Sequence, residues 1–351
     1  MAVDLKGLGV TLTLGALGGA AAHAVNFPLG YLLGSLLTVG IVAATGWRPL
    51  GQAIVLPMRL RMSFVPVIGV AIGGAFTPEV AGQALGWGPS LLALVFFVPL
   101  AHALGYFIFR RGGLSREDAY FGSVPGGLIE SVQLGEEAGA DVRLLTLLQF
   151  LRLILTIVTV PLIFSGVTGH IVGSASGVQM TGAHITLTLR DVIVLLVCGG
   201  VGVVVGRALR FPGWIITGPL AVSALAHALG WVQSVPPAWL MAVTQVVLGT
   251  GLGARFAGMT GAMLRQAGVL ALVNGAAVMA LALGFAIALH ALVGEPVAAV
   301  FLAFAPGGLA EMSLIALSLN MSAIYVTSHH VARIAIAVLA AQYGGRWLRR
   351  G

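Results

Sequence analysis

Ten long apolar segments divide this chain, and they constrain its fold more than any other feature. A helix needs about 20 consecutive apolar residues to cross the hydrocarbon core of a bilayer, and each segment is that long or nearly so. The segments are 8–25, 28–46, 62–77, 89–109, 144–168, 190–208, 213–231, 239–256, 267–293 and 321–343. We therefore expect an all-α integral membrane protein with about ten transmembrane helices, in which the third helix of each set of five is short.

The scarcity of charge indicates that lipid is the main solvent of these segments. Only 8% of the residues are charged, whereas a soluble domain carries about 25%. The net charge of +7 comes from short basic clusters between the apolar segments, which is typical of cytoplasmic loops. We expect the bilayer as the main partner and no direct contact with nucleic acid. The single cysteine excludes a disulfide framework.

The chain contains two copies of one long unit. The motif Pro-Gly-Gly-Leu-x-Glu begins at Pro125 and recurs at Pro306, 181 residues later. In both copies an arginine follows the glutamate of the motif by 22 residues. Four regions follow from this duplication: a first membrane repeat at 7–168, a polar linker at 169–189, a second membrane repeat at 190–344 and a basic cytoplasmic tail at 345–351.

The distribution of basic residues predicts how the two repeats are related. If each Pro-Gly-Gly segment enters the membrane and returns, the second repeat is inverted, and fifteen basic side chains face the cytoplasm with one outside. If each segment spans the membrane, the repeats are parallel and the tally becomes eleven to five. We predict two inverted repeats with both termini in the cytoplasm. The parallel arrangement stays open, because residues 296–320 are apolar enough to span alone.

A broken segment precedes the last helix of each repeat, at 117–139 and at 296–320. Proline and glycine interrupt a helix, and backbone groups freed at membrane depth must face protein or a water-lined cavity. Interrupted segments at matching places of two repeats indicate the binding site of a transporter. We expect the two breaks to meet near mid-membrane, and a kink that serves only packing is the alternative. The glycines of this predicted solute or ion site are Gly126, Gly127, Gly307 and Gly308.

Four charged residues accompany the breaks. Glu130 and Glu311 fall in the first helical turn after each break, where the helix dipole favours a carboxylate. Each either caps its helix or carries H⁺ or Na⁺, since ionisable residues inside a membrane mark functional sites by default. Arg152 and Arg333 lie deep in the last apolar segment of each repeat, so each needs a partner. We expect that partner to be a glutamate or an anionic solute, and buried pairing without transport is the other interpretation.

Two polar residues share the helix face of these arginines. Gln149 precedes Arg152 by three residues, and His330 precedes Arg333 by three. We include both in the predicted site, although hydrogen bonding alone would also explain their presence.

Nothing in the sequence indicates catalysis. His329 and His330 are adjacent, but neighbouring helical residues diverge by about 100°, and the sequence contains no HxxxH, HExxH or CxxC spacing. We therefore expect no catalytic residue, no metal, no cofactor and no enzymatic activity.

The combination of motifs resembles the AbrB-type membrane duplication family over essentially the whole chain. The features that carry the resemblance are the two Pro-Gly-Gly-Leu-x-Glu copies, the stretch from Gly139 to Leu144, the run from Leu147 to Arg152, and the Phe27-Pro28 and Phe211-Pro212 pairs. The resemblance implies a bacterial inner-membrane protein. Family members carry labels of ammonia monooxygenase or of AbrB family transcriptional regulator. A monooxygenase needs a cofactor site and a DNA-binding regulator needs a basic reading element outside the bilayer, and we find neither.

The leading hypothesis is a secondary transporter or exporter of a small solute, coupled to H⁺ or Na⁺. A membrane protein that regulates gene expression through a partner or a transported signal is the alternative, and the monooxygenase comes third. The solute, the direction of transport and a homo-oligomeric state stay open. The limb after the first break is acidic, whereas its counterpart at 316–322 is apolar and ends in Asn and Ser, so we expect the two repeats to differ in function.

Overall fold

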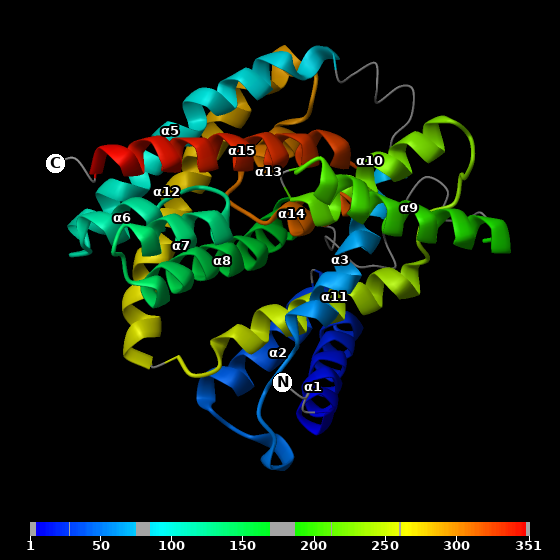
Figure 1. Ribbon diagram of the computed structural model, residues 1–351, viewed down its shortest axis with the longest axis horizontal. Helices are drawn as coiled ribbons and strands as arrows, with labels where there is room; N and C mark the ends of the chain where they lie inside the picture. Colours follow the sequence, from blue (N-terminus) through cyan, green and yellow to red (C-terminus); the bar gives the residue numbers. More distant parts are fainter. Residues whose placement is uncertain are drawn as a thin grey trace. The chain divides into compact units, whose positions relative to one another are not determined.

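The computed structural model describes residues 5–27, 29–74, 85–168, 187–211, 213–259 and 261–348. In these ranges the regular structure is helical and no β-strand occurs (Figure 1). Most of the predicted linker, residues 169–186, and the last three residues of the predicted tail lie outside the described ranges. The domain boundaries drawn from the sequence therefore stay predictions.

Each of the ten apolar segments contains a helix. The first half of the chain forms α1 (Leu5–Ala24), α2 (Gly30–Thr45), α3 (Met58–Gly73), α5 (Gly88–Arg111), α6 (Arg116–Gly122), α7 (Leu128–Glu137) and α8 (Val142–Thr168). The second half forms α9 (Leu189–Ala208), α10 (Trp214–Ala228), α11 (Ala238–Gly253), α12 (Gly261–Val293), α13 (Val297–Phe304), α14 (Leu309–Ser318) and α15 (Ala323–Leu348). Single 3₁₀ turns occur at Pro49–Gly51, Leu85–Trp87 and Ala254–Phe256. The first residues of α13, α14 and α15 follow those of α6, α7 and α8 by 181 residues, the offset found in the sequence.

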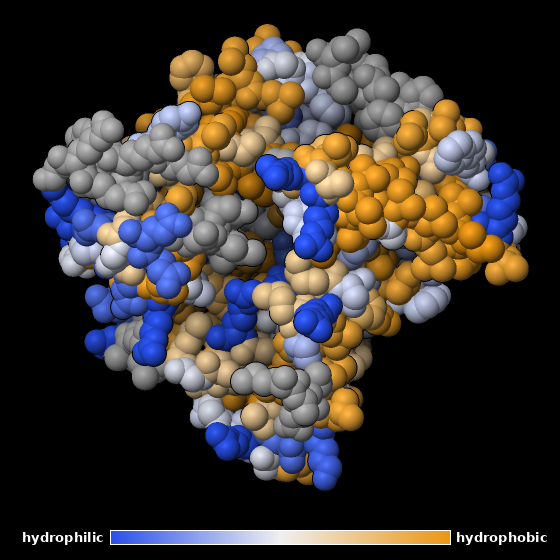
Figure 2. All heavy atoms as spheres, in the orientation of Figure 1, coloured by the Kyte–Doolittle hydropathy of each residue, from blue (hydrophilic) through white to orange (hydrophobic). Residues whose placement is uncertain are grey.

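Six of the described helices are long and apolar enough to cross a membrane. These are α1, α5, α8, α9, α12 and α15, and the shorter α2 and α10 are also apolar. An all-α, multi-pass membrane protein is thus supported by the structure. Figure 2 shows apolar side chains over the part of the molecule where Figure 1 places α9. Leu196 and Val204 of this helix are 70% and 67% exposed, as expected for a surface that faces lipid rather than water.

The first of two compact units combines helices from both halves of the chain. It contains residues 1–81, 158–260 and 313–324. In this unit α2 packs against α1 and α11, while α10 packs against α9 and α3. Small residues allow these close approaches: a Cβ added at Gly202 of α9 would clash with the backbone of α10. Ser223 of α10 also donates a hydrogen bond of 2.8 Å to the carbonyl oxygen of Val70 in α3.

The second unit contains residues 82–157, 261–312 and 325–351, again from both halves. Here α5 packs against α12 and α6, and α12 packs against α13. Three aromatic rings, those of Phe97, Phe285 and Phe304, form part of its core, with centroids 5.1–5.6 Å apart.

The ends of α5 show that it runs antiparallel to α12, its counterpart in the second half. Trp87, just before α5, donates a hydrogen bond of 3.2 Å from Nε1 to Oε1 of Glu295, just after α12. At the opposite end, the Cβ position of Gly112 is 3.2 Å from Cδ1 of Leu270, which lies near the start of α12.

Candidate functional site

The first broken segment, α6 followed by α7, folds back on itself. Ser115 caps the start of α6, where its hydroxyl oxygen accepts a hydrogen bond of 3.0 Å from the Asp118 amide. The same aspartate accepts a bond of 2.8 Å from the amide of Asp141, which directly precedes α8. Farther in, the Cβ position of Gly135 in α7 is 3.1 Å from Cβ of Phe121 in α6. Because the segment begins and ends at one place, it forms a hairpin of two short helices.

The second broken segment, α13 followed by α14, also begins and ends at one place. Glu295, before α13, contacts Trp87 through the hydrogen bond described above. Tyr325, in the first turn of α15, packs its ring against the same tryptophan with centroids 5.2 Å apart. Trp87 lies at the start of α5, whereas α6 begins beyond the end of α5 at Arg111. The two hairpins therefore enter the second unit from opposite ends of α5.

The tip of the first hairpin is held by two side chains of α8. Nε2 of Gln149 lies 3.0–3.2 Å from the carbonyl oxygens of Phe121, Gly122 and Val124. Nη1 of Arg152 donates a hydrogen bond of 2.6 Å to the Val124 carbonyl. These carbonyls stand at the carboxyl end of α6, where helical C=O groups lack internal partners and carry partial negative charge. The buried guanidinium thus satisfies and neutralises a helix end.

The tip of the second hairpin is held in the same way by α15. Nη1 of Arg333 donates to the carbonyl of Ala305, and Nη2 donates to that of Gly307 at 2.8 Å. His330 Nε2 lies 2.9 Å from the Leu302 carbonyl, and its Nδ1 lies 3.1 Å from Nη2 of Arg333. Because guanidinium only donates, the imidazole accepts at Nδ1 and donates at Nε2, so His330 is neutral. Both arginines contact a carbonyl 28 residues earlier in the chain.

The expected pairing of arginine with glutamate is not what the described residues show. The hydrogen bonds of both guanidinium groups go to backbone carbonyls or to His330. The carboxylate of Glu311 instead lies over Gly308 at the start of α14, where a Cβ would clash with Oε2. The side chain of Glu130 is outside the described part of the chain. The physical reason for the difference is that the broken helices themselves supply negatively polarised acceptors.

Each tip packs against the last helix of the other half. The Cβ position of Gly126 is 3.4 Å from Cα of Ile334 in α15, and that of Gly308 is 3.0 Å from Cδ1 of Leu153 in α8. Ile334 directly follows Arg333 in the sequence, and Leu153 directly follows Arg152. The structure thus brings each break into contact with the last helix of the other half, next to Arg152 and Arg333. Gly127 adopts the left-handed conformation (φ +65°) that starts α7.

A second polar cluster, which the sequence did not reveal, lies at the base of the second hairpin. Ser90 Oγ is 2.8 Å from Nε2 of His329, whose Nδ1 is 2.8 Å from the Tyr325 carbonyl oxygen. The His329 and Tyr325 rings are 4.1 Å apart, and Trp87 connects them to Glu295. Burial raises the pKa of Glu295, which lies in the α12–α13 connection, and the hydrogen bond from Trp87 partly opposes this shift.

Within the described ranges, no three His, Cys, Asp or Glu side chains are grouped so that they could bind an ion. His329 and His330 use their ring nitrogens for the hydrogen bonds given above.

Two relatives match nearly the whole chain at low identity. “Uncharacterized protein YhjN” of Bacillus subtilis (strain 168) is 24% identical over 93% of this chain and 89% of its own length. “Putative regulator AbrB” of Escherichia coli (strain K12) is 25% identical over 89% of this chain and 87% of its own length.

A family profile confirms the resemblance noted in the sequence. The profile described as “Transition state regulatory protein AbrB” matches residues 41–349. Because this match extends over most of the chain, the protein belongs to the AbrB family.

Proposed function

We propose that this protein is a secondary transporter or exporter of a small solute in the bacterial inner membrane, coupled to H⁺ or Na⁺. The observation that carries the proposal is the pair of broken hairpins, which enter from opposite ends of α5 and contact α8 and α15 beside Arg152 and Arg333. Helix ends at membrane depth provide backbone donors and acceptors that replace the hydration of a solute or ion.

The packing of equivalent helices supports two inverted repeats, and we propose that they contain ten spans with both termini in the cytoplasm. α5 and α12 occupy matching places in the two repeats and run antiparallel. The equivalent helices α3 and α11 also run antiparallel. The Cβ position of Gly251, near the end of α11, is 2.9 Å from Cδ of Arg61, near the start of α3. Matching helices of a parallel repeat would both begin on one side of the membrane.

The charges at the breaks suggest how an ion is coupled. Arg152 and Arg333 neutralise the carboxyl ends of α6 and α13. Glu130 and Glu311 occupy the first turns of α7 and α14, where the partial charge is positive. Protonation of a glutamate, or Na⁺ bound to it, changes this balance by one unit of charge. Glu311, which is 5% exposed, is the residue to which we assign coupling.

Currents from the reconstituted protein test the proposal. The protein is placed on a solid-supported membrane and challenged with amino acids, carboxylates, sugars and nucleosides under imposed H⁺ or Na⁺ gradients. We expect one of these solutes to evoke a gradient-dependent current. Glu311→Gln should abolish the current while that solute still raises the melting temperature, because Gln resembles the protonated carboxyl group. The exposed Glu136, changed to Gln, is the matched control.

Two results would contradict this account. Undiminished current in Glu311→Gln would remove the coupling role of Glu311, and no current with any solute would remove the transport function. A regulatory role is the second candidate, favoured by the name of the E. coli relative, “Putative regulator AbrB”. It predicts that deletion of the gene changes transcript levels and that a transport-dead Glu311→Gln protein restores them.

A further inference from the structure

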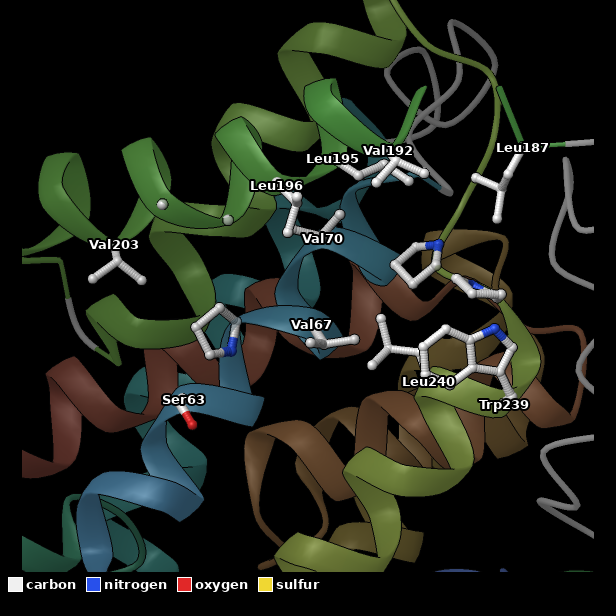
Figure 3. A pocket seen from close by; sticks show the side chains of 15 residues that line it. Ser63, Val67, Val70, Leu187, Val192, Leu195, Leu196, Val203, Trp239 and Leu240 are labelled. Carbon is white, nitrogen blue, oxygen red and sulfur yellow. The ribbon is translucent and has the colours of Figure 1, made fainter. Parts of the chain in front are cut away.

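An apolar groove of 590 Å³ lies within the first unit, between α3, α9 and the start of α11. Figure 3 shows Ser63 and Val203 at one end and Leu187 and Trp239 at the other, with Val70 between them. Apart from the hydroxyl of Ser63 and the indole N–H of Trp239, the lining side chains are apolar. A polar solute would lose its hydrogen bonds to water here without replacement, so this groove does not fit the solute proposed above.

The groove is open to the surface of the first unit, where the exposed side chains are apolar. Leu196 and Trp239, on its two sides, are 70% and 67% exposed. Its floor is smooth, since a Cβ added at Gly200 would meet nothing within 4 Å and one at Gly199 would meet only Val70. From Val192 to Val203 the lining of α9 rises through about 16 Å at 1.5 Å per residue. That length lies within the roughly 30 Å hydrocarbon core, so an acyl chain could lie along α9 at this depth.

In the first half of the chain, the position that corresponds to this groove is occupied by close packing between α1 and α11. α1 corresponds to α9, and its Gly15 would bring a Cβ to 3.2 Å from Cβ of Thr250 in α11. The Cβ position of Gly19 is likewise 3.2 Å from Cγ2 of Val246, and Thr11 Oγ1 accepts a hydrogen bond of 3.0 Å from the Val55 amide. The groove is therefore specific to the second half and does not follow from the repeated fold itself.

Two exposed arginines stand beyond one end of the groove. Arg59 precedes Ser63 by four residues in α3, and Arg207 follows Val203 by four residues in α9. Each is thus about one helical turn beyond the same end. Basic side chains between transmembrane helices at the membrane surface attract anionic lipid headgroups. Trp239, at the opposite end, has the amphipathic ring that is typical of the membrane interface.

We propose that this groove binds an anionic phospholipid. One acyl chain lies along α9 between Val203 and Val192, and the phosphate contacts Arg59 and Arg207. The apolar lining provides affinity through the burial of methylene groups, and the arginines select a negative headgroup. This site is independent of the transport proposal, because its residues belong to the first unit and the broken hairpin tips belong to the second.

Native mass spectrometry of the purified full-length protein tests this site. The protein in detergent is titrated with phosphatidylglycerol and, separately, with phosphatidylcholine, and the bound lipids are counted. We expect wild type to retain phosphatidylglycerol with at least tenfold higher apparent affinity. Gly200→Trp, which fills the groove, should abolish this tight binding. Gly9→Trp, on the exposed surface of α1 where a Cβ also meets nothing within 4 Å, should bind lipid like wild type.

Substitution of both arginines tests the headgroup contact separately from the apolar groove. In Arg59→Gln/Arg207→Gln we expect phosphatidylglycerol to bind no better than phosphatidylcholine, while both still compete for the groove. Unchanged phosphatidylglycerol binding in Gly200→Trp would overturn the proposal. So would a change from dimer to monomer in Gly200→Trp with lipid binding unaffected, because a second copy of the chain would then be the occupant. If Gly200→Trp fails to fold, equal retention of both lipids by wild type would overturn it.

Discussion

The contacts of Arg333 predict the outcome of a double-mutant cycle with Glu311. Arg333→Gln removes the guanidinium from the carbonyls of Ala305 and Gly307, both at the end of α13. Hydrogen bonds of a charged group contribute about 1.5–3 kcal/mol each, so the bonds to these two carbonyls alone imply a loss of about 3–6 kcal/mol in the free energy of unfolding, and the bond to His330 is lost as well. Arg152→Gln removes a single such bond, to Val124, and should cost less than half as much.

The cycle distinguishes a capping arginine from a salt bridge. If Arg333 formed a buried pair with Glu311, either single change would cost about 3–5 kcal/mol and the double change far less than their sum. Because the hydrogen bonds of Arg333 go to backbone carbonyls and to His330, we instead expect a coupling free energy well below that of a buried ion pair. Thermal unfolding in detergent, followed by tryptophan fluorescence, measures all four proteins. Recovery of stability in Glu311→Gln/Arg333→Gln would refute the capping interpretation.

Two further predictions concern the hairpins. Gly127→Ala should destabilise the first tip by about 1–2 kcal/mol, because the left-handed φ of +65° at this position disfavours any Cβ. Gly126→Ala should cost less, since the Cβ position of Gly126 makes only ordinary contacts near 3.4 Å. Equal melting temperatures for the two variants would contradict this prediction. Burial raises the pKa of Glu295, so the folded state binds more protons than the unfolded state. The contribution of Glu295 to stability is therefore greatest below its pKa in the unfolded state, and it falls as pH rises through its pKa in the folded state. Glu295→Gln should flatten this decline in melting curves recorded from acidic to neutral pH, and an unchanged pH profile would show that Glu295 does not cause it.

Sequence patterns located the helices and the breaks well because both signals are local. Long apolar runs specify the helices, and the predicted segment 190–208 differs from α9 by one residue at its start. Pro-Gly-Gly specifies an interruption, and the structure ends α6 at Gly122 and α13 at Phe304, shortly before each motif.

The partners of the site residues could not be predicted because they are not local. The acceptors of Arg152 and Arg333 are backbone carbonyls, which every residue possesses, so the sequence has no signature for them. Trp87 and Glu295 meet across 208 positions of the chain, and one sequence without an alignment does not connect them. The groove depends on how closely α9 approaches α3, which apolar patterning does not specify.

The central claim is that the two hairpins enter the membrane from opposite sides, and cysteine labelling tests it most directly. Single cysteines replace Arg116 and Asp141 at the base of the first hairpin, and Pro296 and Asn320 at the base of the second, in a Cys198→Ala background; all four positions are exposed. An impermeant maleimide is applied to right-side-out and inside-out vesicles. We expect the first pair to label only from the cytoplasmic side and the second pair only from the outside. Labelling of Arg116→Cys and Asp141→Cys from opposite sides would show that the segment spans the membrane and would contradict the inverted arrangement.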